Sequence, residues 1–176
     1  MSEPMSVSAP AEVRRVDVSA LSTLQDLHAR VFAPPDIADV GRRGYRVLHR
    51  WDRRDLRVLI AYERTDSAEP VPVGFKVGYG RSEELFYSAR GGVLPAYRRR
   101  GIGRQLLHEM MRRARTAGYR RCAFHTLPDR HPGMAEMARS EGFRLVGSGY
   151  HPAYEDHILR FEKTLTPRSD SSRSHT

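Results

Sequence analysis

A glycine- and arginine-rich stretch in the middle of the chain carries the residues best suited to chemistry. Arg98, Arg99 and Arg100 follow a proline and precede Gly101 and Gly103, where an amphipathic pattern typical of a helix begins. The first N–H groups of a helix have no intrahelical partner, and the helix dipole places partial positive charge there. Glycines let the backbone approach a ligand closely, and arginines add charge and bidentate donors. The stretch therefore predicts a site for a phosphate-bearing anion.

Residue spacing separates the phosphate-binding designs that share this logic. A Walker loop requires Lys and then Ser or Thr after its second glycine, but Arg104 and a glutamine follow Gly103. A dinucleotide fingerprint requires a third glycine where Leu106 stands, and no acidic residue closes a following strand at the expected distance. Both designs match poorly. The pattern that remains is Gln/Arg-x-x-Gly-x-Gly/Ala, which Arg98, Gly101 and Gly103 fulfil.

With this motif the chain resembles the GNAT superfamily of acyl-CoA-dependent N-acyltransferases, over about residues 13–165. The strongest match is GGVLPAYRRRGIGRQLL from Gly91, which includes a V-x-P-x-Y/F-R/Q lead-in. A second match is EGFRLVG from Glu141, similar to a Gly-Phe element found late in these enzymes. A third, GFKVGY followed by LFYSARGGVLP, is similar to a bacterial subgroup.

The resemblance implies acetyl-CoA as the acyl-donor cosubstrate. The arginine segment and the amides of residues 101–104 would hold its pyrophosphate, and the backbone of residues 92–94 would lie along the pantetheine arm. The cofactor-binding residues implied in this way are Gly92, Val93, Leu94, Arg98, Arg99, Arg100, Gly101, Ile102, Gly103 and Arg104. In the superfamily the thioester lies where the preceding strand splays from its neighbour. The pair Gly91–Gly92 independently indicates a bulge or a close backbone approach, because glycine weakens a strand.

The elements that must position this stretch alternate between strand and helix patterns. Apolar residues spaced by three and four predict a helix capped by Ser19 and another from residue 102 to Gly118, and a helix within 36–50 is weakened by two glycines. Short β-rich segments predict strands at 56–62, 71–79, 85–94, 121–126, 143–146 and 157–165, with a short helix at 134–140. We expect an α/β (α+β) domain with a mixed, largely antiparallel central sheet and helices on both faces. The resemblance adds a splayed pair of central strands.

Length and composition limit the class of protein. The 176 residues fit one domain at 13–165, with disordered polar tails at 1–12 and 166–176. No apolar run is long enough to span a bilayer, which excludes transporters and channels and predicts no membrane partner. The sequence starts without a signal-peptide pattern, so we expect a cytoplasmic protein. The single cysteine, Cys122, excludes a disulfide framework, and the histidines lack metal-ligand spacing, so no metal is expected.

The net charge of +9 favours an anionic partner. Of the 30 basic residues only two are lysines, Lys76 and Lys163. The arginines are spread along the whole chain, and no recognition motif accompanies them. A nucleic-acid-binding module is therefore the weaker alternative, and we expect no nucleic-acid partner.

Acetyl transfer to a primary amine requires an acceptor for the amine's proton and donors for the developing oxyanion. Glu84, just before a central strand, is the leading candidate base, with Glu83 behind it, although the two also fit an exposed turn. Tyr87 follows them and could order water. The expected reaction is direct attack in a ternary complex, and the acceptor is a small-molecule or peptide amine. Homodimer formation stays open.

The general acid departs from the family pattern. Many members carry a tyrosine four residues before the glycine of the late Gly-Phe element, and in this chain that residue is Ala138. The role is then vacant or supplied from elsewhere, with Tyr150, Tyr154 and His125 as candidates, although His125 in an apolar strand also fits a core histidine. A protein of this fold that binds acyl-CoA without turning it over, as a sensor or partner, is the main rival to the enzyme hypothesis.

Overall fold

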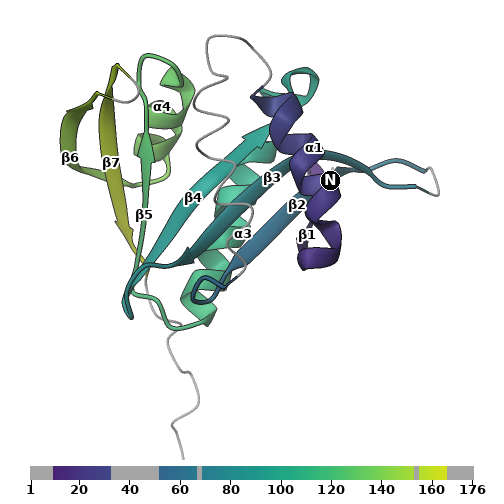
Figure 1. The fold of residues 1–176 in the computed structure, drawn as a ribbon, viewed down its shortest axis with the longest axis horizontal. Helices are drawn as coiled ribbons and strands as arrows, with labels where there is room; N and C mark the ends of the chain where they lie inside the picture. The colour runs from purple at the N-terminus through teal and green to yellow at the C-terminus, as the bar shows by residue number, and fades with distance from the viewer. Residues whose placement is uncertain (1–9, 33–51, 67–68, 153–154, 166–176) are drawn as a thin grey trace, which may run out of the picture.

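The structure is a computed structural model that describes residues 10–32, 52–66, 69–152 and 155–165. These residues form one seven-stranded sheet with helices on both faces (Figure 1). The strands are β1 (Ala11–Val16), β2 (Arg57–Glu63), β3 (Val71–Gly80), β4 (Leu85–Val93), β5 (Arg121–Thr126), β6 (Arg144–His151) and β7 (Asp156–Thr164). The α-helices are α1 (Leu21–Val31), α3 (Ile102–Thr116) and α4 (Pro132–Ser140), and short 3-10 turns lie at Val18–Ala20 and Pro95–Tyr97.

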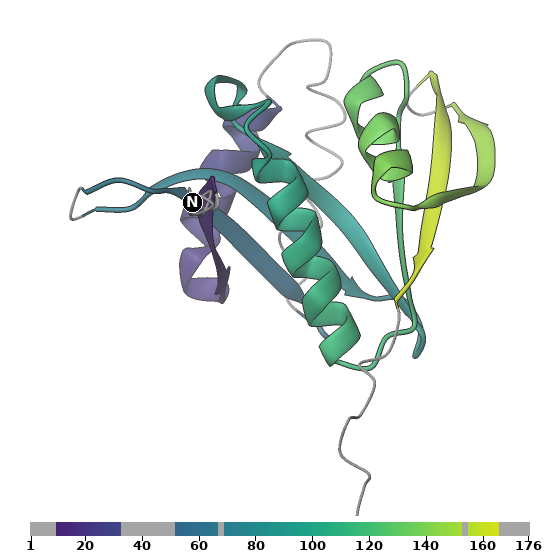
Figure 2. The same ribbon diagram turned by 180° about the vertical axis from the view of Figure 1, so that it is seen from behind.

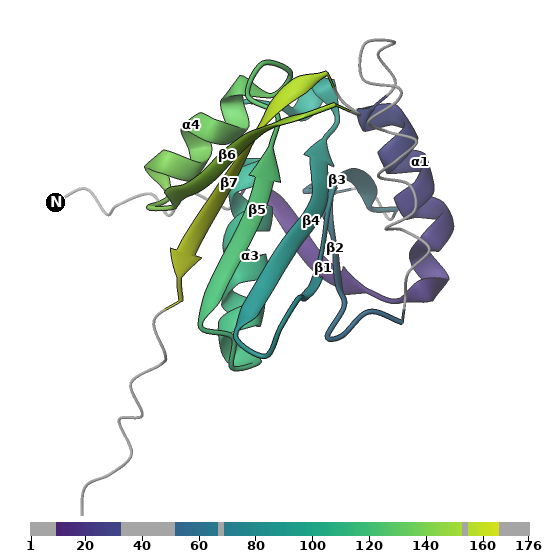
Figure 3. The same cartoon turned by 60° about the vertical axis from the view of Figure 1, so that its left-hand side comes forward.

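The sheet has the order β1-β2-β3-β4-β5-β7-β6, and every neighbouring pair is antiparallel except β4 and β5. The parallel pairing of β4 and β5 extends only from Leu85↔Arg121 to Tyr87↔Ala123. Beyond those pairs the two strands diverge, although each continues for several residues (Figures 1 and 3). The prediction of a mixed, largely antiparallel sheet with a splayed central pair is confirmed.

Helices cover the two faces of the sheet unequally. α1 packs on one face, where Leu24, Leu27 and Val31 meet the inward side chains of β2 and β3. α3 and α4 pack on the other face, as Figure 2 shows from behind. The stripe that holds α3 against the sheet is the one read from its periodicity: Ile102, Leu106, Leu107, Met110, Met111 and Ala114 are all buried. Helices on both faces were expected from the sequence.

Two local features differ from the sequence expectations. The helix expected from Ser19 begins with a 3-10 turn, and its cap is Asp17, whose carboxylate accepts a hydrogen bond of 2.9 Å from the Ser19 amide. β1 starts at Ala11, inside the segment expected to be a tail. Ala11 is buried, and its backbone exchanges two hydrogen bonds with the Gln105 side chain, at 2.6 and 3.2 Å. The expected helix within 36–50 lies outside the described residues.

β4 contains a bulge next to its glycine pair. Ser88 pairs with Gly78, and Arg90 pairs with Val77, which leaves Ala89 without a partner across the ladder. A bulge increases the local twist and bends the strand. The bend lies where β4 leaves β5, so it helps to separate the two strands.

Candidate active site

A cavity of about 800 Å³ lies where β4 and β5 diverge. Its wall is formed by β3, β4 and β5 together with the first turns of α3 and α4. Six cationic side chains line it, and Glu136 is the one carboxylate among the lining residues that the structure describes. The cationic residues are Lys76, Arg90, Arg98, Arg99, Arg104 and Arg130. Such a wall favours a ligand with several negative charges.

The start of α3 forms one end of the cavity. Gly101 is the N-cap residue, with a φ of +80° in the left-handed region that glycine adopts without strain. Gly103 follows in the first turn, and a Cβ atom placed on it would meet only Val93 Cγ2, at 3.8 Å. The first helical N–H groups are therefore open to a ligand, and the helix dipole favours an anion there.

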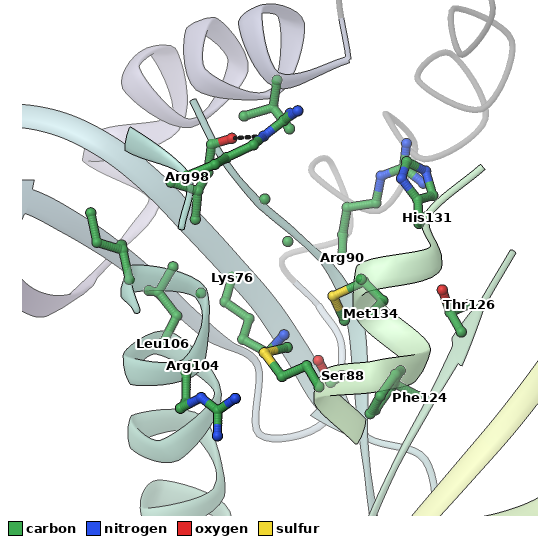
Figure 4. A pocket seen from close by; sticks show the side chains of 18 of the residues that line it. Lys76, Ser88, Arg90, Arg98, Arg104, Leu106, Phe124, Thr126, His131 and Met134 are labelled. Atoms are coloured by element: carbon green, nitrogen blue, oxygen red, sulfur yellow. Dashed lines mark hydrogen bonds between the residues drawn. The ribbon is translucent and has the colours of Figure 1, made fainter. Parts of the chain in front are cut away.

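Two arginines brace this end of the cavity (Figure 4). Arg98 Nε donates a hydrogen bond of 3.0 Å to the Val93 carbonyl and so ties the loop back to the end of β4. Arg104 pairs with the Glu141 carboxylate and donates a 3.2 Å hydrogen bond to Ser140 Oγ. These contacts of Arg104 link the start of α3 to the end of α4, and they fix the width of the cavity between the two helices.

A tyrosine–histidine pair lies further along the cavity, on the strands that diverge. Tyr87 Oη of β4 and His125 Nδ1 of β5 share a hydrogen bond of 2.8 Å, and both side chains line the cavity. Burial lowers the pKa of His125, and the charges of Arg160 and Arg81 lower it further. The imidazole is therefore neutral near pH 7. In the tautomer in which Nδ1–H donates to the Tyr87 phenol oxygen, Nε2 carries no proton and can accept one.

The structure places the other expected catalytic residues away from this cavity. Glu84 lies just before β4, at the end where β4 and β5 are still paired; its side chain is 57% exposed and its carboxylate is 3.9 Å from Arg120. Tyr150 lies on β6, is 59% exposed and contacts the His157 ring. Neither is among the lining residues. Tyr154 lies outside the described residues.

The residues expected to bind the cofactor reach the cavity with two exceptions. Leu94 is a buried part of the core under α1, and its amide donates to the Val73 carbonyl at 2.9 Å. Arg100 packs over the Tyr97 ring, 5.1 Å from its centroid. The others line the cavity: Gly92, Val93, Arg98, Arg99, Gly101, Ile102, Gly103 and Arg104.

The lining residues that the sequence analysis did not anticipate include Lys76, Arg90 and His131. The signal for Lys76 was present, because it is a charged residue in the middle of an apolar strand. Arg90 of β4 donates a 3.2 Å hydrogen bond to His28 Nε2 of α1, on the face of the sheet that α1 covers. Contacts of that kind join segments distant in sequence and leave no local pattern.

In the described part of the chain, no helix is both long and apolar enough to cross a membrane. Within the same residues, no three His, Cys, Asp or Glu side chains converge as metal ligands would.

Solved structures with similar folds support the architecture. A protein from Desulfovibrio desulfuricans described as a GNAT-family acetyltransferase superposes with a TM-score of 0.69 at 17% identity, covering 89% of this chain and 99% of that one. Arabidopsis thaliana NAA60 in complex with acetyl-CoA gives 0.66 at 18% identity, with 88% and 98% covered. The ribosomal-protein-S18-alanine N-acetyltransferase from Escherichia coli gives 0.65 at 13% identity, with 93% and 99% covered.

Comparisons of sequence rather than structure identify the family. No curated protein sequence matches the chain. The family model for the acetyltransferase (GNAT) family matches residues 23–143, which span the loop before α3, both diverging strands and the start of the late Gly-Phe element. This match covers most of the chain. The chain therefore belongs to the acetyltransferase (GNAT) family.

Proposed function

We propose that the protein is an N-acetyltransferase that moves an acetyl group from acetyl-CoA to a primary amine. The observation that carries this proposal is the single cavity that joins an anion-binding helix start to the Tyr87–His125 pair through the gap between β4 and β5. One end suits a pyrophosphate, and the other end offers a proton acceptor. A long, narrow, phosphate-bearing donor fits such a path.

The residues at the start of α3 fit the coenzyme. The amides of the first turn, with Arg98, Arg99 and Arg104, would hold the pyrophosphate, and the edge of β4 at Gly92 and Val93 would guide the pantetheine arm toward β5. Bound there, acetyl-CoA supplies an activated acyl group. Leu94 and Arg100 stand outside the proposed contact set, because one is core and the other packs on Tyr97.

Direct attack by the amine is favoured over an acyl-enzyme. The only cysteine, Cys122, is fully buried, and burial raises its pKa to about 12, so it is not a reactive nucleophile. His125 accepts the proton of the attacking amine, and Tyr87 orients the imidazole. The acceptor is a small-molecule or peptide amine. Initial velocities measured over both substrates should give intersecting reciprocal plots, and parallel plots would contradict the ternary complex.

The rival is a member of the same fold that binds acyl-CoA without acetylating an amine. Thermal shift measurements separate ligands first: acetyl-CoA should raise Tm by mass action, and an oligonucleotide of matched charge should not. A coenzyme A release screen over amines and peptides, with mass spectrometry of the products, then tests turnover. Tight binding of acetyl-CoA with no acetylated product across the panel would establish the rival. Stabilisation by the oligonucleotide alone would favour the nucleic-acid module.

A further inference from the structure

Lys76 is a buried cation in the middle of β3. Its side chain is 7% exposed, and its neighbours Phe75 and Val77 belong to the core. It pairs across the sheet with Leu59, whose side chain lies in the core under α3. Lys76 therefore projects from the α3 face, and it lines the cavity between α3 and α4 (Figure 4).

Gly91 gives the lysine its path. The two residues pair across β3 and β4, and a Cβ atom placed on Gly91 would lie 3.3 Å from Lys76 Cγ and 3.5 Å from Lys76 Nζ. The aliphatic stem thus lies over the bare backbone of Gly91, and the amine reaches across β4. Ser88, which lies before Gly91 on β4 and is 5% exposed, lines the same cavity.

The Lys76 ammonium has no protein partner among the described residues. The other lysine, Lys163, donates a 2.6 Å hydrogen bond to the Glu141 carbonyl, whereas Lys76 makes no hydrogen bond or ion pair there. Burial lowers the pKa of Lys76 to about 8, and the Cys122 thiol is the titratable group that opposes this shift. Lys76 Nζ is not one of the fully buried polar atoms that lack a hydrogen bond, so the amine opens onto the cavity rather than into the sealed core. Its place in the cavity wall points to a ligand with negative charge that completes the site.

The two faces of the sheet present different chemistry to the gap between β4 and β5. Cys122 and Phe124 of β5 belong to the α3 face with Lys76, and His125 alternates to the opposite face. The proton acceptor and the buried cation therefore approach the gap from opposite sides. An acyl group held in the gap would meet the amine from one side and release its thiol toward the other.

We propose that the Lys76 ammonium contacts the sulfur of coenzyme A and stabilises the leaving thiolate by its positive charge. This inference rests on the proposed N-acetyl transfer. The new N–C bond forms as the C–S bond breaks, and the sulfur keeps the electron pair of the broken bond. The amine's proton goes to His125, and the sulfur leaves as a thiolate paired with the Lys76 ammonium. Solvent exchange then removes the proton from His125, and the released coenzyme A thiolate takes its proton from water.

The residue at position 138 is consistent with this role for Lys76. Ala138 is fully buried in the core that contains α3 and α4, and a methyl group can donate no proton. A cation from β3 would stabilise the thiolate without a side chain from α4. Tyr150 is exposed on β6 and does not line the cavity, and His125 is engaged with Tyr87 on the opposite face of the sheet.

The test measures the thiol pKa of bound coenzyme A from the ultraviolet absorbance of the thiolate, with desulfo-coenzyme A as the reference titration. We expect the bound thiol to titrate at least one unit below the free-thiol value of ~8.5, because a cation beside it favours the thiolate. The single protein thiol does not interfere, because its pKa is about 12. A bound thiol with the pKa of free coenzyme A would overturn the proposal without any variant.

Variants then assign the effect to one residue. Lys76→Met, which has a similar length and no charge, should return the thiol pKa to the free value and lower kcat about 10- to 100-fold, with a smaller change in KM for acetyl-CoA. Lys76→Arg should keep most of the pKa shift. Lys163→Met is the matched control and should leave the shift intact. A shift that survives Lys76→Met contradicts the assignment.

Two further results separate this proposal from the proposed function. Transfer of an acetyl group to Lys76 itself, located by peptide mass spectrometry, would make the amine a nucleophile and would overturn its role as the cation beside the thiolate. A lowered thiol pKa that depends on Lys76, in a protein that acetylates nothing, would uphold the contact and defeat the proposed transfer. Acetylation of an amine by a protein whose bound coenzyme A keeps the free-thiol pKa would uphold the proposed transfer and defeat the contact with Lys76.

Discussion

Val31 of α1 lies directly against Gly92 of β4. A Cβ atom on residue 92 would stand 2.3 Å from Val31 Cγ1, a distance that no packed side chain can occupy. The helix therefore sits on β4 only because residue 92 has no side chain. Both residues also line the cavity, so the same contact sets the distance between α1 and the strand that guides the donor.

Gly92→Ala should destabilise the folded protein by about 1–3 kcal/mol, because the added methyl group overpacks this contact. Urea denaturation measures the loss. In the background of Val31→Ala the same substitution should cost much less, since the clashing methyl is gone. Equal costs in both backgrounds would show that the contact with Val31 is not the source of the strain.

Gly103→Asp should abolish acetyl-CoA binding and leave the fold intact. The site has room for a side chain, since its Cβ atom would meet only Val93 at 3.8 Å, and the carboxylate would occupy the place of the pyrophosphate. Calorimetry measures the binding of acetyl-CoA, and circular dichroism checks that the fold is intact. Gly149→Asp on β6 adds the same charge in open space away from the cavity and should bind normally. Normal affinity in Gly103→Asp would refute the cofactor site.

Arg98→Ala should weaken acetyl-CoA binding by about 1–3 kcal/mol through the loss of a charge-assisted contact. Arg100→Ala tests the neighbouring position, where the side chain packs over Tyr97 outside the cavity. Its effect on the dissociation constant should be small, and calorimetry at two salt concentrations removes the contribution of net charge. A larger loss from Arg100→Ala than from Arg98→Ala would reverse the placement of the two arginines.

The pH dependence of turnover should report His125. Its pKa lies below the ordinary value, so the neutral base dominates at neutral pH, and kcat should fall as the pH drops through that lowered pKa. His125→Gln should remove this acid limb and lower kcat about 100-fold or more. Tyr87→Phe should move the limb, because it removes the phenol that shares the hydrogen bond with Nδ1.

Glu84→Gln is the decisive comparison for the same profile. The sequence predicts that it lowers turnover, whereas its exposed position beside Arg120 predicts little change. Steady-state kinetics of the two variants over the same pH range measure the contrast. A lost limb in Glu84→Gln and an intact one in His125→Gln would restore Glu84 as the base.

Much of the fold was predictable because its signals are local. α3 shows its buried stripe in its own periodicity, and it closes at Gly118, which adopts the left-handed φ of +96°. β1 escaped prediction because three of its six residues are charged, so little apolar alternation remains. The position of β1 depends on the hydrogen bonds between Ala11 and Gln105, which are 94 residues apart. Such a tertiary contact leaves no mark in the local pattern.

The candidate site divides in the same way. The end predicted to bind an anion is one continuous segment, from β4 to the first turn of α3, so its residues could be selected from local spacing. The other end is assembled from separate strands: Tyr87 and His125 are 38 residues apart, and Lys76 reaches the cavity across β4. Glu84 is close to Tyr87 in sequence, but it stands at the paired end of the strands, so proximity along the chain does not bring its side chain to the cavity.

The short β4–β5 seam also has a consequence for local unfolding. β1 to β4 form one meander of sequential antiparallel pairs, β5 to β7 form another block, and three residue pairs join the two across the sheet. Two cooperative units that share so few hydrogen bonds should open separately in native-state hydrogen exchange. A ligand that bridges β4 and β5 would couple them. If acetyl-CoA slows the exchange of amides in both blocks, binding has made the two blocks open together as one cooperative sheet.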